Sequence, residues 1–256
     1  MAGRRLRQGY STPHNQNLAT FFSRRSGRIL FENMEATGES RGFRKAFSSI
    51  LNNVGPRILD FSFLNGFLVC HLLQLKAAHD AWQSQAGKSR ITSIGISEQV
   101  VSEISRRIKS APGAKDFNLE FFLHKNLDQS VIRDGFYGGF DTIIVANLFF
   151  HFPPDDRIKI ASKFTHYLAD GGLLISLEAF PSGVNAARFV SRPLQMTEYL
   201  AGNLNISNAF QNVCFPMSVV ELHHEILTDA GLNLLGHGSR FRVSDEITIH
   251  SATFYK

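Results

Sequence analysis

Short apolar runs alternate along the chain with stretches in which apolar residues recur every third or fourth position. A short continuous apolar run is typical of a buried strand, whereas the wider spacing is typical of a helix with one buried face. The apolar runs predict five strands, over residues 58–61, 91–96, 119–123, 140–146 and 173–177. The spaced pattern predicts four helices, over residues 42–52, 67–82, 97–110 and 153–168.

Strands that alternate with helices predict a parallel sheet with helices on both faces. A further helix over residues 219–230 ends at Gly231, and strands over residues 232–236 and 247–254 are expected to close the sheet as an antiparallel hairpin. The glycine pair at residues 171–172 is expected to close the helix before it and to turn the chain. The predicted fold class is α/β, with a doubly wound, mostly parallel sheet of seven strands.

The stretch over residues 181–217 breaks this rhythm, because it is long, only partly helical in pattern and contains several Phe, Met, Tyr and Asn residues. An insertion of this length is typical of a lid over the strand ends. We therefore expect residues 42–256 to form one domain, with residues 181–217 as its lid. Residues 1–41 are expected to form a separate basic arm.

Six arginines of the arm occur before the first acidic residue, Glu32. They are Arg4, Arg5, Arg7, Arg24, Arg25 and Arg28. This composition suits either an arm that lies over the fold or a mitochondrial transit segment. Phe21, Phe22 and Ile29 have the character of docking residues and favour the arm. The formal charge of +5 is modest, so the arm is the only support for RNA as a partner.

The composition also indicates the compartment of the protein and argues against a membrane span and a metal site. The two cysteines, Cys70 and Cys214, exclude a disulfide framework and indicate a reducing compartment such as the cytoplasm. No apolar run is long enough to span a membrane. The adjacent His223 and His224 would point to different faces of the last helix, so we expect no metal site there. Phe occurs 23 times against one Trp, which indicates a bulky core or an aromatic-lined pocket.

Three segments carry a resemblance to a known family. Residues 140–154 are FDTIIVANLFFHFPP, residues 168–177 are LADGGLLISL, and helix 219–230 is followed by Gly231. In order and spacing they resemble class I S-adenosylmethionine-dependent methyltransferases, over about residues 43–256. The resemblance implies a Rossmann-like methyltransferase fold, S-adenosylmethionine as cofactor and methyl transfer as activity.

The resemblance also implies a cofactor site, but several of its residues depart from the family pattern. The family's first loop has an acid followed by alternating glycines; Asp60 matches the acid and Gly66 the last glycine, while Ser62 and Leu64 replace the other two. Gly95 stands where the family has an acid for the ribose hydroxyls, and a Gly95→Asp variant that gains cofactor affinity would confirm that this missing carboxylate matters. The full set of predicted cofactor-binding residues is Asp60, Ser62, Gly66, Gly95, Ile96, Asn126, Leu127 and Asn147, with the adenine near Asn126 and Leu127.

Two polar residues are the catalytic candidates. His151 follows the fourth strand and Glu178 ends the fifth, so both lie at the carboxyl edge of the predicted sheet. His151 is a candidate base, or a residue that only caps a loop; Glu178 is a candidate for orienting the acceptor, or a solvated surface residue. The residues predicted to line the acceptor pocket are Phe150, Phe180, Phe189, Met196, Tyr199 and Phe210.

These observations support two functions. The first is methyl transfer from S-adenosylmethionine to a small, partly apolar acceptor. The second is a methyltransferase-like protein that has lost methyl transfer and acts as a repurposed enzyme, for example a cyclase, or as a non-catalytic partner subunit. The departures at Ser62, Leu64 and Gly95 favour the second, and the order of the family segments favours the first.

Overall fold

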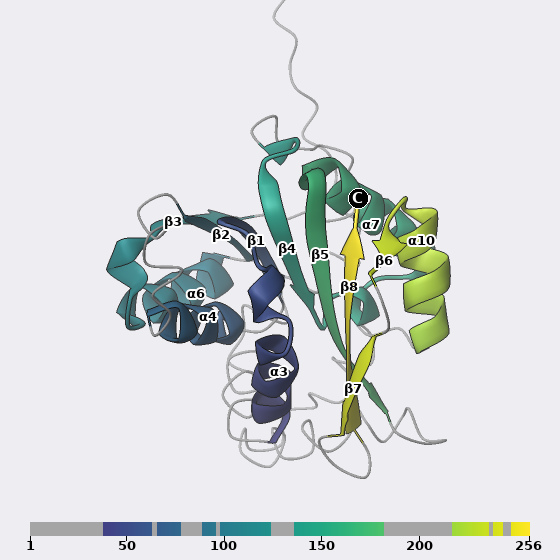
Figure 1. The fold of residues 1–256 in the computed structure, drawn as a ribbon, viewed down its shortest axis with the longest axis horizontal. Helices are drawn as coiled ribbons and strands as arrows, with labels where there is room; N and C mark the ends of the chain where they lie inside the picture. The colour runs from purple at the N-terminus through teal and green to yellow at the C-terminus, as the bar shows by residue number, and fades with distance from the viewer. Residues whose placement is uncertain are drawn as a thin grey trace, which may run out of the picture.

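One eight-stranded sheet organises the chain, in the order β3-β2-β1-β4-β5-β8-β6, with β7 also paired to β8 (Figure 1). The five strands from β3 to β5 run parallel. β8 runs antiparallel to β5, and both β6 and β7 run antiparallel to β8. The direction of winding reverses between β1 and β4, and ligands bind at the carboxyl end of such a switch point.

The computed structural model describes residues 38–62, 66–77, 89–95, 98–123, 136–181, 217–235, 238–242 and 247–256. The strands are β1 Arg57–Ser62, β2 Arg90–Gly95, β3 Asn118–Leu123, β4 Phe140–Ala146, β5 Leu168–Pro181, β6 Asn233–Leu234, β7 Ser239–Arg242 and β8 Ile247–Tyr255. The helices are α3 Gly38–Ser48, α4 Phe67–Ala77, α6 Glu98–Ser110, α7 Pro154–Tyr167, the π-helix η5 Glu221–Ile226 and α10 Leu227–Asp229. Short 3-10 turns are η1 Leu51–Asn53, η2 Ala114–Asp116 and η4 Phe149–His151.

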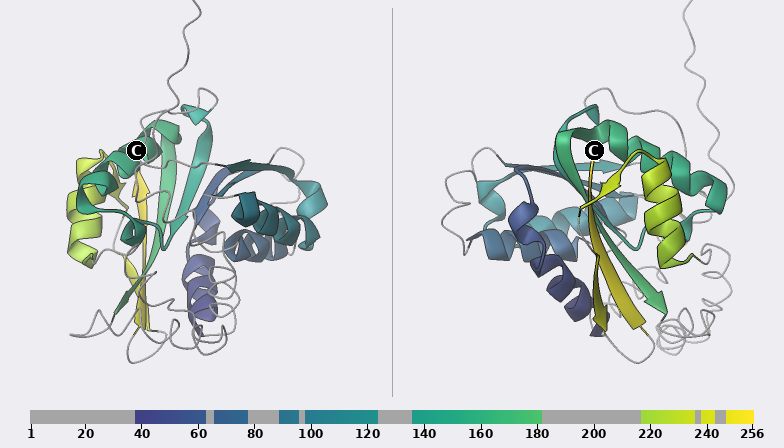
Figure 2. Two further views of the ribbon diagram at one scale, coloured as in Figure 1. Left: turned by 180° about the vertical axis from the view of Figure 1, so that it is seen from behind. Right: turned by 45° about the vertical axis from the view of Figure 1, so that its right-hand side comes forward.

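Helices cover both faces of the sheet, as the alternating pattern predicted (Figures 1 and 2). α3, α4 and α6 lie on one face, and α7, η5 and α10 lie on the other. α6 shows why its sequence folds this way, since Val100, Ile104 and Ile108 recur at helical spacing and are all buried. α7 begins with Pro154 in its first turn, followed by Asp155 and Asp156, where the helix dipole favours negative charge.

Edge-to-face aromatic contacts fill much of the core. Phe136 makes such contacts with Phe140 at 5.2 Å and with Tyr167 at 5.5 Å, and Phe61 contacts Phe164 at 5.1 Å. This geometry aligns the positive edge of one ring with the negative face of the other. These phenylalanines therefore belong to the core, which was one of the two roles expected for them.

Most predicted elements are confirmed, but the sheet has eight strands rather than seven. The sequence pattern missed β7, which pairs with β8 from Ser239↔Ser251 to Arg242↔Thr248. The predicted helix 219–230 is also corrected, because Glu221–Ile226 is a π-helix. π-helices are rare and their periodicity differs only slightly from that of an α-helix, so residue spacing does not distinguish them.

The fifth strand is longer than predicted, and its glycines have a different role. α7 ends at Tyr167, where the following Leu168 is already extended, and β5 begins at Leu168. The glycine pair therefore lies within β5 and does not close the helix. Gly171 has a φ of +74°, and the pairing of β4 with β5 shifts register in this region, between Phe140 and Thr142.

The predicted basic arm is described only from residue 38, and the predicted lid only at its two ends, so both predictions lie largely outside the described residues. In the part of the chain that the structure describes, no helix is both long and apolar enough to cross a membrane.

Candidate functional site at the carboxyl edge of the sheet

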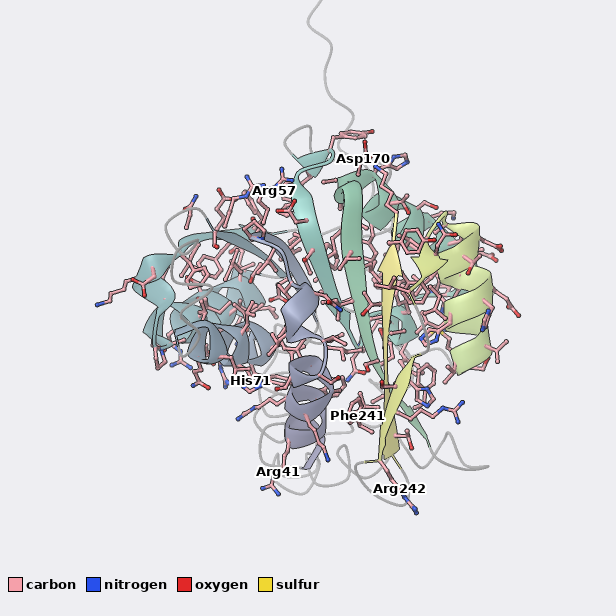
Figure 3. The ribbon with its side chains drawn as sticks, viewed as in Figure 1. Arg41, Arg57, His71, Asp170, Phe241 and Arg242 are labelled. Atoms are coloured by element: carbon pink, nitrogen blue, oxygen red, sulfur yellow. The ribbon has the colours of Figure 1, made fainter. Side chains whose placement is uncertain are left out.

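The carboxyl ends of the parallel strands gather the predicted site residues at one edge of the sheet. Arg57 and Asp170, labelled in Figure 3, lie at the opposite edge, where β1 and β5 begin. There Arg57 forms an ion pair with Asp141 of β4 at 2.5 Å. This pair aligns the beginnings of β1 and β4, and so helps to set the register of the two strands at the switch point.

Asp60 lies near the end of β1 and is almost completely buried, with 1% of its surface exposed. One carboxylate oxygen accepts a hydrogen bond from the hydroxyl of Ser93, on the neighbouring strand β2, at 3.1 Å. The two residues are also register partners in the parallel pairing. Sequence reasoning identified the acid but not the serine that orients it.

Gly66 begins the turn into α4 in the left-handed conformation, with a φ of +78°. A Cβ atom at this position would lie 3.2–3.3 Å from side-chain atoms of Ile104 and Ile108 of α6. Both the backbone conformation and the close approach of α6 therefore require glycine here. The backbone carbonyl of Gly66 accepts the N–H of Cys70 at 3.0 Å, which closes the first turn of α4.

Gly95 ends β2, and any side chain at this position would require Val101 to shift. A Cβ atom would lie 2.7 Å from a methyl carbon of Val101 and 3.0 Å from its backbone nitrogen. The start of α6 thus occupies the space that an aspartate at residue 95 would need. This close approach argues against a ribose-binding carboxylate at residue 95, because the new side chain would first have to displace Val101.

The remaining predicted cofactor residues are described only in part. Ile96, Asn126, Leu127 and the loop position Leu64 lie outside the described residues, as do the predicted pocket residues Phe189, Met196, Tyr199 and Phe210. Ser62 is described as the last residue of β1, where it pairs with Ala146.

Asn147 follows β4 with a φ of +49°, in the left-handed region that few residues other than glycine adopt. Its backbone N–H donates to the carbonyl of Leu177 at 3.1 Å. Its side-chain oxygen accepts the backbone N–H of Ala179 at 3.0 Å. Asn147 therefore continues the pairing of β4 with β5 beyond the end of β4, and its amide oxygen is engaged in this contact.

Glu178 of β5 is fully buried, so the alternative of a solvated surface residue is wrong. Its Oε1 accepts the backbone N–H of Leu148 at 3.0 Å, whereas its Oε2 has no hydrogen-bond partner among the described residues. Burial raises the pKa of this carboxyl to about 8, against the opposing effects of the backbone N–H groups of Leu148 and Phe149 and of the charge of Arg157. Glu178 is therefore protonated at neutral pH.

The turn η4 that carries His151 is held by a completely buried arginine. Arg157 of α7 donates its Nε–H to the carbonyls of Phe149 and Phe152, at 3.2 and 3.0 Å. Its Nη1 forms an ion pair with Glu221 of the π-helix. His151 itself is buried, and its backbone N–H donates to the carbonyl of Leu148 at 3.1 Å. The imidazole thus sits on a turn fixed by α7 on one side and by Glu178 of β5 on the other.

An aromatic cluster lies beside these groups. Phe150 contacts Phe180 with ring centroids 5.4 Å apart, and Phe180 contacts His250 edge-to-face at 5.1 Å. The predicted pocket residues Phe150 and Phe180 are thus brought together, joined by a histidine that sequence reasoning missed. His250 is the register partner of Glu178, so the two side chains project from the same face of the sheet.

A third buried histidine, His223, lies on the same face. It contacts Phe254 at 5.5 Å, and its Nε2 has no partner among the described residues. Burial, together with the smaller effect of nearby positive charge, lowers the pKa of His223 and of His250 to about 4. His224 is exposed, as the opposite-face argument predicted. Within the described residues no group of three or more His, Cys, Asp or Glu side chains could hold a metal ion.

Solved structures of other proteins resemble this chain, whereas sequence comparisons find no match. No protein-family profile and no curated protein matches the chain. Among solved structures it is similar to magnesium protoporphyrin IX methyltransferase from Synechocystis PCC 6803 with bound SAH, at 14% identity and a TM-score of 0.58, over 94% of this chain and 99% of that one. It is also similar to geranyl diphosphate methyltransferase in complex with GPP and sinefungin, at 9% identity and a TM-score of 0.61, over 95% and 99%.

A third similar structure is human N-acetylserotonin methyltransferase in complex with SAM, at 15% identity and a TM-score of 0.54. The match covers 94% of this chain but only 59% of the human one. All three identities are low, so the likeness concerns the fold. With its strand order and its switch point between β1 and β4, the chain has the fold of class I S-adenosylmethionine-dependent methyltransferases.

Proposed function

We propose that this protein is an S-adenosylmethionine-dependent methyltransferase that acts on a small, partly apolar acceptor. The observation that carries the proposal is the junction of β1 and α4. There a buried carboxylate, Asp60, is followed by the left-handed Gly66 at the switch point of the sheet. Solved structures of the same fold hold SAM or SAH.

The residues at this junction fit the cofactor in part. Asp60 offers a carboxylate oriented by Ser93, and Gly66 lets the chain turn closely into the N-terminus of α4. Residue 95 offers no acid, because Val101 fills the space beside it. Glu98, in the first turn of α6, is the next carboxylate along the chain and the candidate to replace it. The adenosyl end of the cofactor would therefore lie between Asp60 and α6.

Methyl transfer from a sulfonium requires few chemical steps from the protein itself. When bound, S-adenosylmethionine supplies a methyl group on a sulfonium that needs no further activation. The protein must then orient the acceptor atom, exclude water and take up the proton that the acceptor loses. His151, on the turn held by Arg157 and Glu178, is the candidate base. Phe150 and Phe180 would hold the apolar part of the acceptor away from water.

One observation favours a second function. The packing of Gly95 against Val101 leaves no room for the ribose-binding acid at its usual place. Charge-assisted hydrogen bonds are worth about 1.5–3 kcal/mol each, so the loss of two would weaken the cofactor severely. A protein of this fold that no longer transfers methyl groups, and acts as a repurposed enzyme or a partner subunit, is therefore the alternative.

Titration calorimetry with S-adenosylmethionine and S-adenosylhomocysteine separates the two functions. Micromolar binding supports the transferase, whereas no binding at millimolar ligand supports the alternative. An Asp60→Asn variant should weaken binding by about tenfold or more, since it removes the charge but keeps an acceptor for Ser93. The matched control is Asp170→Asn, at the opposite edge of the sheet, where the aspartate is fully exposed (Figure 3).

A second measurement addresses the candidate base. His151→Gln should lower kcat with a panel of phenols and thiols while leaving S-adenosylhomocysteine affinity unchanged. His166→Gln, an exposed histidine on α7, is the control and should change neither quantity. If both variants behave alike, His151 is not the base.

A further inference from the structure

Two rows of side chains cross the antiparallel part of the sheet on the face that carries the aromatic cluster. Directly opposed residues of antiparallel strands project from the same face. The pairing of β5 with β8, and of β8 with β7, therefore defines the rows. They are Glu178–His250–Arg240 and Phe180–Thr248–Arg242. Each row leads from the site residues on β5 to an arginine on β7.

The face changes in character along these rows, from apolar to positively charged. Phe180 and His250 are buried and in edge-to-face contact, and Phe150 adds a third ring. Arg240 and Arg242, on β7, are both exposed. Between them, Phe241 points to the opposite face, toward α3 (Figure 3). Since three adjacent strands span about 10 Å, the distance from the aromatic end to the arginines suits one small molecule.

No negative charge in the first row balances Arg240. Among the described residues Arg240 forms no ion pair, and the carboxyl in its row, Glu178, is buried and has its pKa raised to about 8. His250, between the two, has its pKa lowered to about 4, by burial first and then by the charge of Arg240. At neutral pH the row therefore carries a net positive charge at its exposed end and none elsewhere.

We propose that the methyl acceptor is an organic acid, whose carboxylate or phosphate binds Arg240 and Arg242 while its apolar body lies against Phe180 and Phe150. A guanidinium presents paired N–H groups that match a carboxylate or phosphate in two parallel hydrogen bonds. The aromatic end then places the reacting atom toward η4 and His151. This inference rests on the proposed function, but binding of the acid can be measured without catalysis.

The test uses an acid and its neutral analogue on the full chain. Naphthoate and naphthamide share the same flat body and differ in charge, so titration calorimetry with each separates the contributions of charge and apolar surface. We expect naphthoate to bind the wild type more tightly. Arg240→Gln and Arg242→Gln should each weaken naphthoate by about tenfold, and leave naphthamide unchanged. Arg240→Lys should lose less, because it keeps the charge without the paired donors.

The matched control is Arg41→Gln, an exposed arginine on α3, which packs on the opposite face of β7 (Figure 3). It should affect neither ligand. The proposal is overturned if naphthoate does not bind at millimolar concentration, if it binds no better than the amide, or if all three arginine variants act alike. It is also overturned if the β7 variants lose an RNA oligonucleotide while naphthoate does not bind, since the arginines would then serve a polyanion.

The same titrations are run with and without S-adenosylhomocysteine. Failure to bind that ligand contradicts the proposed function alone, because the preference for acid over amide is still measured directly. The two failures are thus distinguishable.

Discussion

The carboxyl group of Glu178 on β5 accepts the backbone N–H of Leu148, thirty residues earlier in the chain, at 3.0 Å. This bond joins the end of β5 to the segment that leads from β4 into η4. Because η4 carries His151, the buried acid sets the position of the candidate base through the backbone. Its protonation at neutral pH also makes the stability of the fold depend on pH.

Glu178→Gln should flatten the pH dependence of stability above about pH 5. The carboxyl keeps its proton up to about pH 8 when folded but ionises near 4.5 when unfolded, so unfolding releases a proton in this window. Stability of the wild type therefore falls as pH rises, by up to about 1.4 kcal/mol per pH unit from this group. Glutamine still accepts the N–H of Leu148. Urea unfolding at several pH values measures the difference between the two proteins.

The control is Glu103→Gln on α6. The neighbouring Arg106 and Arg107 hold the pKa of Glu103 at about 2, so this acid is ionised in both states above pH 5. Its substitution should shift stability by the same amount at every pH in the window. A wild type and a Glu178→Gln variant with parallel pH curves would show that Glu178 is already ionised in the fold.

Acid should destabilise the protein through its buried histidines. His223 titrates near pH 4 when folded and near 6.5 when unfolded, so the unfolded chain binds an additional proton between these values. Stability therefore falls as the pH drops from 6.5 to 4. His223→Gln should reduce this slope, whereas His224→Gln, the exposed neighbour, should leave it unchanged. Equal slopes in all three proteins would contradict the burial argument. Denaturant unfolding across this range provides the measurement.

Removing the buried guanidinium should be costly. Arg157→Leu leaves Glu221 and the carbonyls of Phe149 and Phe152 without their donor. Each buried acceptor left without its donor costs about 1–3 kcal/mol, so the two carbonyls account for most of the expected loss. Arg106→Gln removes an exposed arginine that also pairs with a glutamate, and should change stability little. Thermal and urea unfolding measure the stability of the two variants. Similar losses of stability would show that the buried contacts of Arg157 contribute no more than an exposed ion pair.

Gly95→Asp should destabilise the protein without gaining affinity for S-adenosylhomocysteine, because its Cβ would meet Val101. Adding Val101→Ala removes the methyl carbon at 2.7 Å but not the backbone nitrogen at 3.0 Å. The double variant should therefore recover part of the lost stability, relative to Val101→Ala alone. Unfolding midpoints and calorimetry check both statements. A single variant that is as stable as the wild type and binds the ligand better would contradict them.

The repetitive part of the fold was predictable because local pattern and tertiary role agree there. β4 is a continuous apolar run that is buried on both faces, and its predicted bounds match the structure. β7 was missed because its four residues, Ser239–Arg242, contain only one apolar side chain. Such a strand is defined by its pairing with β8, and pairing between distant segments leaves little trace in local composition.

The chemistry of the site was less predictable, since burial decides it. Nothing near Glu178 in the sequence distinguishes a surface carboxylate from a buried acid with a raised pKa. Arg157 has the same local setting as many exposed arginines on helices. His250 acquires its place from β5 and β7, which border it on either side. In each case the environment comes from residues that are far away in the chain.

The position of β8 in the sheet has a consequence for how the chain folds as it is made. β6 and β7 are synthesised before β8, yet among the described strands each of them pairs with β8 alone. A domain generally folds as a unit, so these two segments lack their partner strand until β8 has been synthesised. Arg240 and Arg242 therefore cannot take their places beside the aromatic cluster before β8 is present.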